Sequence, residues 1–155
     1  NDARGSIMKF TSILDEQKLM DTVLISSNLT KGTVRGMHLQ LHPFEEEKLI
    51  TCIQGAVFDV IIDLRPVSLT FAKWASIELN PNNCNQLFLP PGIAHGFQTL
   101  LPNSTMHYCI QGVYTPNSAI SIRPRNELNL EWPLSFSNIS VLLKTSTSVF
   151  SRSGA

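Results

Sequence analysis

The sequence lacks an excess of charge of either sign. Its 155 residues include 12 Lys and Arg and 12 Asp and Glu, so the formal net charge is zero. Proteins that hold nucleic acid or an anionic membrane by electrostatic attraction rely on a basic excess. We therefore expect no nucleic-acid partner and no membrane partner, while a locally basic pocket remains compatible with a neutral chain.

Long apolar runs and paired cysteines are also missing. No run approaches the roughly 20 apolar residues of a membrane-spanning helix, and the first residues lack the basic and then apolar order of a signal peptide. Both features predict a cytoplasmic protein. The 3 cysteines, Cys52, Cys84 and Cys109, show no CxxC spacing. Because an odd number argues against a disulfide framework, we expect free thiols.

Helical periodicity is scarce, and the clearest instance in the first half is a short stretch at residues 11–20. Most of the chain instead consists of short apolar or alternating runs separated by Gly, Pro and Asn. The runs expected as strands are residues 22–26, 33–41, 49–53, 57–64, 74–79, 86–89, 95–101, 105–111 and 119–123. This pattern predicts a single all-β domain over residues 1–155, a jelly-roll barrel with short helical pieces.

Residues 32–48 (GTVRGMHLQLHPFEEEK) contain most of the polar side chains that could do chemistry. Strand alternation predicts that His38 and Gln40 share one face while Arg35 and Met37 share the other. Lys48 follows within reach of the same hairpin. A guanidinium, an imidazole and an ammonium group so close together exceed what a structural strand needs, although each residue taken alone is more often structural.

His95, Tyr108 and Tyr114 are further candidates. His95 follows a rigid Pro-Pro-Gly turn at residues 90–92 and is the first polar side chain of the strand that begins there. The two tyrosines alternate with polar neighbours, and they could equally line the barrel with a hydroxyl partner.

A metal site is an alternative use of the histidines. Metal centres in jelly-roll barrels gather two histidines and a carboxylate on early strands and a third histidine later. His38, His42, residues 45–47 and His95 offer such groups, but Gln40 stands where a His-x-His pair would place its second ligand. We therefore expect no metal.

A set of motifs in sequence order narrows the interpretation. They are Asp2-x-Arg4-Gly5, KGTVRGMHLQ at residues 31–40, Lys48-Leu49, GAVFDVIIDLR at residues 55–65, PPGIAHGF at residues 90–97, Tyr108, Tyr114-Thr115-Pro116 and Glu131-Trp132-Pro133. Together they resemble the dTDP-4-dehydrorhamnose 3,5-epimerase family, of which this chain looks like a divergent member. RGxH combined with PxGxAHGF is the most specific part of the resemblance.

The resemblance implies a cupin-like jelly roll (double-stranded β-helix) that forms a homodimer and uses no metal or organic cofactor. Its substrate would be a nucleotide-diphosphate 4-keto-6-deoxy sugar. The reaction would be removal of a proton α to the C4 ketone, which gives an enolate, and reprotonation from the opposite face. This chemistry serves deoxysugar and polysaccharide biosynthesis.

The resemblance also assigns catalytic roles residue by residue. His38 matches the base, and a neutral imidazole near its usual pKa of about 6.5 suits that role. Lys48 matches the cation that stabilises the enolate oxygen, and Tyr108 matches the acid on the other sugar face. Asn126 or Arg125 stands where the family has the Asp that pairs with the base, and Glu127 is a possible substitute.

The substrate-binding matches follow from the same resemblance. The residues expected to bind substrate are Arg4 and Arg35 at the diphosphate, Tyr114 at the nucleobase, His95 in the pocket with Asp63 as its proposed partner, and Gln40. Lys9 stands where the family often has a carboxylate that accepts a hydrogen bond from the base. The nucleotide carrier is therefore left open.

Three functions remain distinguishable at this level. The first is the cofactor-independent epimerase, with a 3,4-ketoisomerase as a variant that shares the enolate. The second is a sugar-nucleotide-binding homologue whose missing carboxylate at Asn126 reflects lost catalysis. The third is a metal-dependent cupin enzyme.

Overall fold

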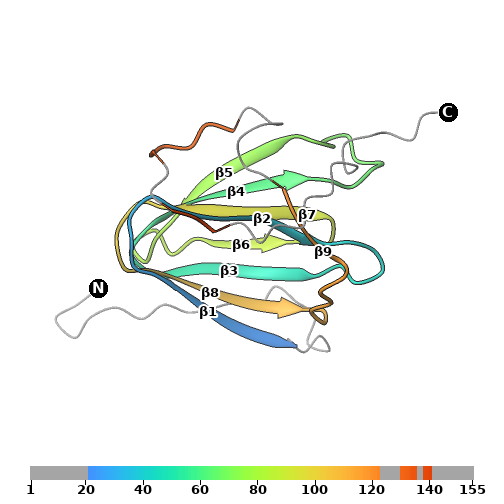
Figure 1. Ribbon diagram of the computed structural model, residues 1–155, viewed down its shortest axis with the longest axis horizontal. Helices are drawn as coiled ribbons and strands as arrows, with labels where there is room; N and C mark the ends of the chain where they lie inside the picture. The colour runs from blue at the N-terminus through green and yellow to red at the C-terminus, as the bar shows by residue number, and fades with distance from the viewer. Residues whose placement is uncertain (1–20, 123–129, 136–137, 141–155) are drawn as a thin grey trace.

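The computed structural model describes residues 21–122, 130–135 and 138–140, and every regular element in these ranges is a strand (Figure 1). The strands are β1 (Thr22–Asn28), β2 (Thr33–Gln40), β3 (Glu47–Gln54), β4 (Val57–Asp63), β5 (Trp74–Leu79), β6 (Gln86–Leu89), β7 (Ile93–Thr99), β8 (Ser104–Gln111), β9 (Ala119–Ser121) and β10 (Asn138–Ser140). The helical piece expected at residues 11–20 lies outside the described residues. Within them, no helix capable of crossing a membrane is found.

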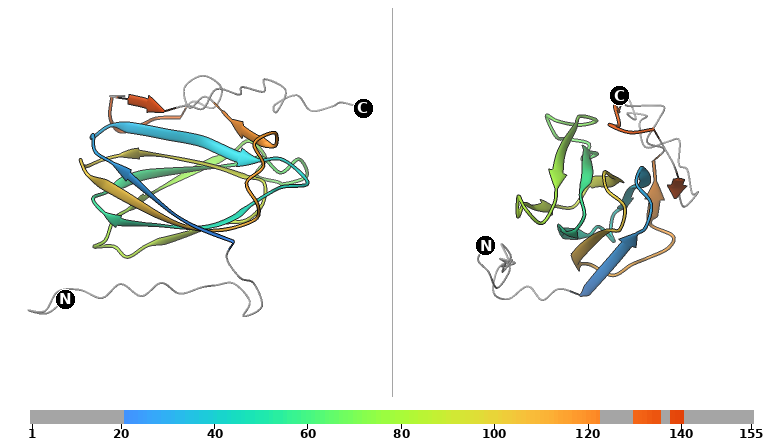
Figure 2. Two further views of the ribbon diagram at one scale, coloured as in Figure 1. Left: turned by 60° about the horizontal axis from the view of Figure 1, so that its bottom comes forward. Right: turned by 90° about the vertical axis from the view of Figure 1, so that its left-hand side faces the viewer.

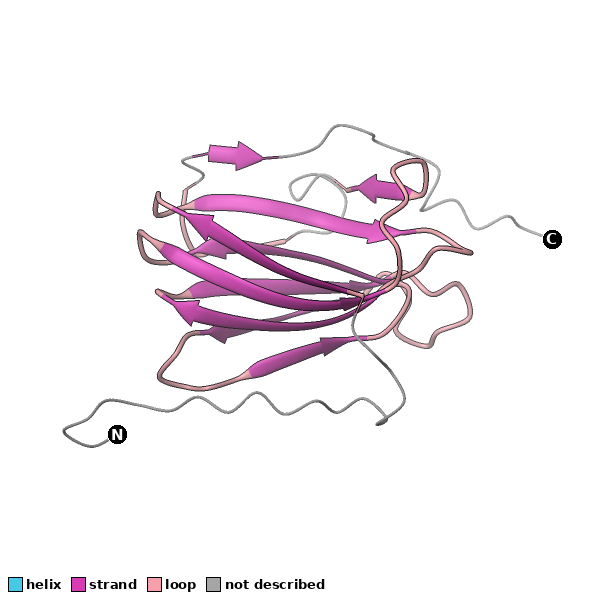
Figure 3. Ribbon diagram, turned by 90° about the horizontal axis from the view of Figure 1, so that it is seen from below, coloured by secondary structure: helices cyan, strands magenta, loops and turns pink. Residues whose placement is uncertain are grey.

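The strands form two sheets that face each other (Figures 2 and 3). One sheet has the order β1-β8-β3-β6, and the other has the order β10-β2-β7-β4-β5, with β9 also pairing with β2. All pairs are antiparallel except β10 with β2. The all-β jelly-roll prediction is confirmed, and the predicted ends of β1 to β9 agree within two residues, whereas β10 was not predicted.

Strand alternation separates an inner apolar cluster from an outer one. The inner cluster fills the space between the sheets and includes Ile50, Phe97 and Met106. The outer cluster covers the far side of the larger sheet and includes Val60 and Ile62. Because β4 and β7 contribute to both clusters, every second side chain on these strands faces the barrel interior.

The segment at residues 130–135 packs on the outer side of the larger sheet. The ring of Trp132 meets Phe58 edge-on, with 6.2 Å between the centroids and 70° between the planes. The buried Gln98 side chain donates to Leu134 O at 2.9 Å and accepts from Leu134 N at 3.0 Å. Two hydrogen bonds between the Gln98 side chain and the Leu134 backbone, together with apolar contacts, therefore hold this segment against the sheet.

An irregularity in β2 changes which side chains face inward. The register between β2 and β7 shifts between Arg35 and His38. Gly36 has φ of 107°, and a Cβ added there would lie 2.5 Å from Gly96 Cα, so two facing glycines let the strands approach. The prediction that Arg35 and His38 face opposite sides is therefore wrong. Both face the interior, while Met37 belongs to the outer cluster.

Candidate functional site

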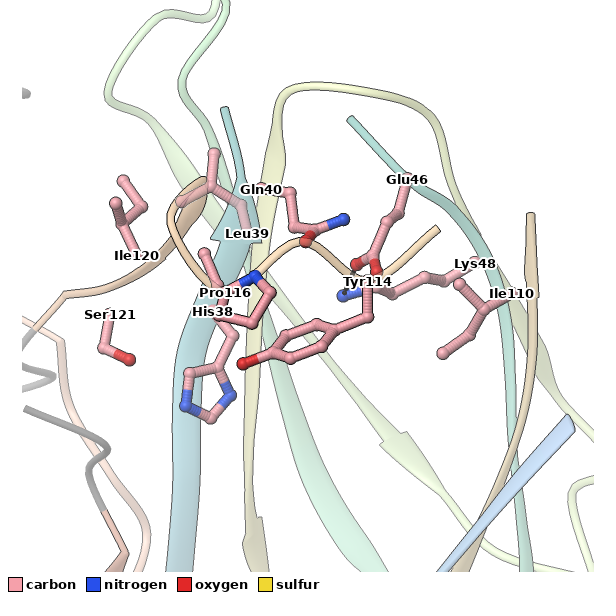
Figure 4. A pocket seen from close by; sticks show the side chains of 11 residues that line it. His38, Leu39, Gln40, Glu46, Lys48, Ile110, Tyr114, Pro116, Ile120 and Ser121 are labelled. Carbon is pink, nitrogen blue, oxygen red and sulfur yellow. Dashed lines mark ion pairs between the residues drawn. The ribbon is translucent and has the colours of Figure 1, made fainter. Parts of the chain in front are cut away.

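Two adjoining cavities lie at the barrel interior and its mouth. The larger has a volume of about 430 Å³ and opens between the loops at the end of the barrel (Figure 4). The smaller, of about 230 Å³, lies deeper. His38, Lys48 and Ile110 line both, so the cavities meet at these three side chains. Their combined volume is within the range of sites for small molecules.

The side chains that line the smaller cavity come from opposite sheets. Arg35 and His38 on β2 and His95 on β7 form one wall. Lys48 on β3 and Tyr108 on β8 form the other. A molecule bound between the walls is therefore approached by an imidazole from one side and by a phenol and an ammonium group from the other.

His38 presents a buried ring nitrogen to this space. Its Nε2 is buried and has no hydrogen-bond partner among the described residues. The pKa of His38 is lowered to about 4, mainly by burial and in addition by the charges of Lys48, His95 and Arg35. The expectation of a pKa near 6.5 is therefore wrong. The imidazole is neutral at physiological pH, which leaves Nε2 available to take a proton.

His95 is held by a carboxylate, but not by the one that the sequence suggested. Its Nε2 lies 2.7 Å from Asp59 Oδ2, and Asp59 is completely buried. Burial raises the pKa of Asp59, and the neighbouring His95 opposes that shift. The contact orients the His95 ring at the back of the cavity.

Asp63, the predicted partner of His95, has a different role. Its carboxylate accepts hydrogen bonds from Arg65 Nε at 2.9 Å, Ser68 Oγ at 2.6 Å and Thr70 Oγ1 at 2.6 Å. The hydrogen bond from Arg65 is the main reason why the pKa of Asp63 lies well below its usual range. Asp63 organises the loop between β4 and β5 and lines neither cavity. The predicted contact of Asp63 with His95 is wrong, because Asp59 holds that ring.

Tyr108 packs edge-on against His95, with 6.1 Å between the ring centroids and 75° between the planes. Burial raises the pKa of the phenol well above its ordinary value, and the carboxylate of Asp59 adds to the shift. The hydroxyl group is consequently protonated in the resting site and can donate its proton.

Arg35 is anchored through one nitrogen. Its Nε donates to Asn28 Oδ1 at 2.6 Å, and the buried Asn28 donates in turn to Ser104 O at 3.2 Å and Ser26 O at 3.1 Å. The anchor is neutral, so the charge of the guanidinium is not cancelled by it. A guanidinium fixed in this way suits a phosphate group.

Lys48 is paired with a neighbouring carboxylate. Its Nζ lies 2.9 Å from Glu46 Oε2, and the side chains are 16% and 9% exposed, respectively. Figure 4 shows this ion pair at the wall of the larger cavity.

The side-chain amide of Gln40 forms hydrogen bonds with the backbone of two loops. Its Nε2 donates to Phe44 O at 2.8 Å and to Val113 O at 3.1 Å, and its Oε1 accepts from Thr115 N at 2.6 Å. Both amide hydrogens are thus occupied. Although Gln40 lines the larger cavity, the structure favours a role in ordering its mouth over the predicted role in binding substrate.

The remaining predicted residues lie at the mouth or beyond the described part. Tyr114 is 64% exposed and lines the larger cavity. Arg4 and Asn126 lie outside the described residues. His42, which the metal alternative needs, is exposed, pairs with Glu45 at 3.1 Å and lines neither cavity. No group of three or more potential metal ligands occurs in the described residues.

Sequence reasoning missed Asp59, Glu46 and Asn28. Asp59 had a usable signal, because it is a carboxylate inside the otherwise apolar run VFDVII. Glu46 was one of three successive glutamates, and only the structure separates it from the other two. Nothing in the sequence marked Asn28 as the partner of Arg35.

Comparison with known proteins gives a consistent result. The model of the family described as dTDP-4-dehydrorhamnose 3,5-epimerase matches residues 1–148. The enzyme of that name from Sinorhizobium fredii is 37% identical over 123 residues, which cover 79% of this chain and 62% of the relative. The chain therefore spans about three fifths of this curated relative.

Solved structures agree in fold. The crystal structure of dTDP-4-dehydrorhamnose 3,5-epimerase from Bacillus anthracis with TDP and PPi bound has a TM-score of 0.75 and 36% identity, with 77% of this chain and 69% of that chain covered. The dTDP-6-deoxy-D-glucose-3,5-epimerase of Legionella pneumophila, in complex with dTDP-4-keto-L-rhamnose, has a TM-score of 0.78 and 30% identity, with 90% and 78% covered.

Proposed function

Because the chain belongs to the dTDP-4-dehydrorhamnose 3,5-epimerase family, we propose that it is an isomerase that epimerises a nucleotide-diphosphate 4-keto-6-deoxy sugar at C3, C5 or both. The reaction would supply a deoxysugar pathway and would need no metal or organic cofactor. The observation that carries this proposal is the pair of opposing walls. One wall presents His38 Nε2, which has no hydrogen-bond partner among the described residues, and the other presents the phenol of Tyr108.

In the first step, His38 Nε2 takes the proton from the carbon next to the C4 ketone, and the electrons move into an enolate. Lys48 donates a hydrogen bond to the enolate oxygen as its charge develops. Arg35 binds the diphosphate, and Tyr114 packs beside the nucleobase at the mouth. His95, oriented by Asp59, completes the pocket wall.

In the second step, Tyr108 gives its proton to the opposite face of the same carbon. The shifted pKa values favour the return to the starting state. Protonated His38, whose pKa is about 4, releases its proton readily, whereas a Tyr108 phenolate regains one readily. A base this weak can remove the proton only if the enolate is strongly stabilised. The contribution of Lys48 to the rate is therefore expected to be large.

We also propose that the protein acts as a homodimer. β1 is an edge strand of the smaller sheet. Val23 and Ile25 on this strand are 63% and 61% exposed. An apolar edge strand is an aggregation hazard when uncovered, and pairing with a second copy would cover it. Sedimentation equilibrium of the purified protein tests this, since a monomer at micromolar concentration would contradict it.

The test of the activity is proton NMR in deuterated water with dTDP-, GDP-, CDP- and UDP-linked 4-keto-6-deoxy sugars. Loss of the C3 or C5 proton signal is expected for one carrier at least. His38→Ala should stop the loss, and His42→Ala is the matched control because His42 is exposed outside the cavities. Persistence of every signal with wild-type protein would contradict the proposal.

A second candidate function is a binding protein without catalysis. The low pKa of His38 and the amide at Asn126 favour it, because neither provides the strong base that a His–Asp pair supplies. Calorimetry tests for binding of a sugar nucleotide, and NMR tests for exchange between about pH 5 and 9, the expected working range of a general base. Binding without exchange at any of these pH values would support this function over the epimerase.

A further inference from the structure

Among the carboxylates of the described residues, Glu46 alone lines the cavities around His38 and Lys48. A carboxylate that is only 9% exposed is costly unless a cation compensates it. Lys48 supplies that cation at 2.9 Å. The Lys48 wall of the site is therefore nearly neutral before substrate binds.

The position of Glu46 is set by its surroundings on several sides. Glu46 directly precedes β3, on which Lys48 lies, and its carboxylate reaches the Lys48 Nζ at 2.9 Å. A Cβ added to Gly112 would lie 3.3 Å from Glu46 Cγ, so the end of β8 packs closely on the Glu46 stem. Gln40 holds the preceding loop through Phe44 O at 2.8 Å. Glu46 is thus a fixed acceptor for the ammonium group.

The two cations of the site are consequently held in different ways. Arg35 is anchored by the neutral amide of Asn28, so its charge remains available to an anionic ligand from the start. Lys48 is anchored by an anion, and an ammonium group has three donors, so its remaining N–H groups can point at an oxygen. The Lys48–Glu46 pair therefore attracts the uncharged ketone of the bound substrate only weakly. Its ammonium group stabilises the negative charge that develops on the substrate oxygen during the reaction.

Resting on the proposed function, we propose that Glu46 is a positioning residue that holds Lys48 Nζ toward the C4 oxygen of the sugar. The diphosphate is captured mainly by Arg35, and the enolate is stabilised by Lys48 in the orientation that Glu46 sets. Preorganised donors of this kind accelerate the chemical step because they need no rearrangement when the transition state forms.

A double-mutant cycle tests the coupling. Glu46→Ala should lower kcat for solvent exchange about 10- to 100-fold, with KM changed by less than about threefold. Glu46→Gln keeps an acceptor and should lose less. In a Lys48→Ala background, Glu46→Ala should change kcat by less than about twofold. Equal losses in both backgrounds, or a loss confined to KM, would overturn the proposal. Glu45→Ala is the matched control, because Glu45 pairs with exposed His42.

A second readout does not depend on turnover. Acetylation of Lys48 by an N-hydroxysuccinimide ester, followed by mass spectrometry, reports how firmly the amine is held. Glu46→Ala should raise the labelling rate of Lys48 several-fold relative to exposed Lys73, and Glu45→Ala should not. An unchanged rate would overturn the contact even if exchange persists. If wild-type protein shows no exchange, the proposed function fails, and the labelling alone decides whether Glu46 holds Lys48.

Discussion

His95 Nε2 lies 2.7 Å from Asp59 Oδ2, and the contact joins two neighbouring strands inside the barrel. The second oxygen of Asp59 is buried and has no hydrogen-bond partner among the described residues. Burying a carboxylate with only one hydrogen-bond partner destabilises the fold, and the hydrogen bond with His95 offsets part of that cost. The pair fixes the ring that packs against Tyr108.

Asp59→Asn should reduce turnover more than it reduces stability. The amide keeps the shape of the side chain but removes the charge and the fixed tautomer of His95. We expect kcat for solvent exchange to fall about 10- to 100-fold, as for other partners that orient a functional histidine. Asp63→Asn is the control, because its contacts are confined to the loop between β4 and β5. It should lower the unfolding temperature and leave kcat unchanged, and equal kcat losses in both variants would contradict this role of Asp59.

The pH dependence of exchange should reflect the low pKa of His38. Because the pKa lies at about 4 in place of 6.5, kcat/KM should stay constant as pH falls through 6.5 and decline only near pH 4. A midpoint near 6.5 would contradict the buried imidazole. The measurement needs unfolding curves at each pH, so that loss of fold is separated from protonation of the base.

The same shift has a consequence for stability. Between pH 6.5 and about 4 the unfolded chain binds a proton at His38 that the folded chain does not. The contribution to stability is therefore complete above pH 6.5 and is lost as pH falls toward 4. His38→Gln should flatten this part of the curve of unfolding free energy against pH, and an unchanged curve would show that other groups dominate.

Asn126→Asp tests the departure from the family pattern. If residue 126 takes the role of the family's Asp, as the resemblance implies, a carboxylate there would stabilise the imidazolium of His38 and raise the pKa of the base. We expect kcat to rise at least about tenfold, given the much larger losses when Asp is replaced by Asn in other His–Asp pairs. Asn129→Asp is a charge-matched control in the same segment. If both variants behave like wild type, another group already serves His38.

Ala72→Gly should stabilise the protein. Ala72 has φ of 60°, in the left-handed region, and its N–H donates to Asp63 O at 2.7 Å. Glycine adopts this conformation without the Cβ clash, and after its larger loss of entropy we expect a gain of about 0.5–1 kcal/mol in the free energy of unfolding. Ala75→Gly, in the extended and exposed part of β5, should instead destabilise. Urea denaturation of the two variants decides the point.

The sequence predicted the strands well because alternation and turn residues are local signals. It failed at the Gly36 irregularity, since one extra residue in a strand leaves no mark in the pattern but reverses the face of Arg35 relative to His38. It also chose the wrong partner for His95. Asp59 and Asp63 lie symmetrically about Ile61, the residue paired with His95, so only the side-chain contacts distinguish them.

The reacting groups proposed here sit on two sheets whose separation, about 10 Å in such packings, is set by apolar side chains. Ile50, Cys52 and Met106 pack between the sheets, line neither cavity and act as spacers. A substitution among them that preserves stability would still alter the gap across which a proton is removed and returned. Selection for catalysis would then act on the volume of residues that never touch the substrate.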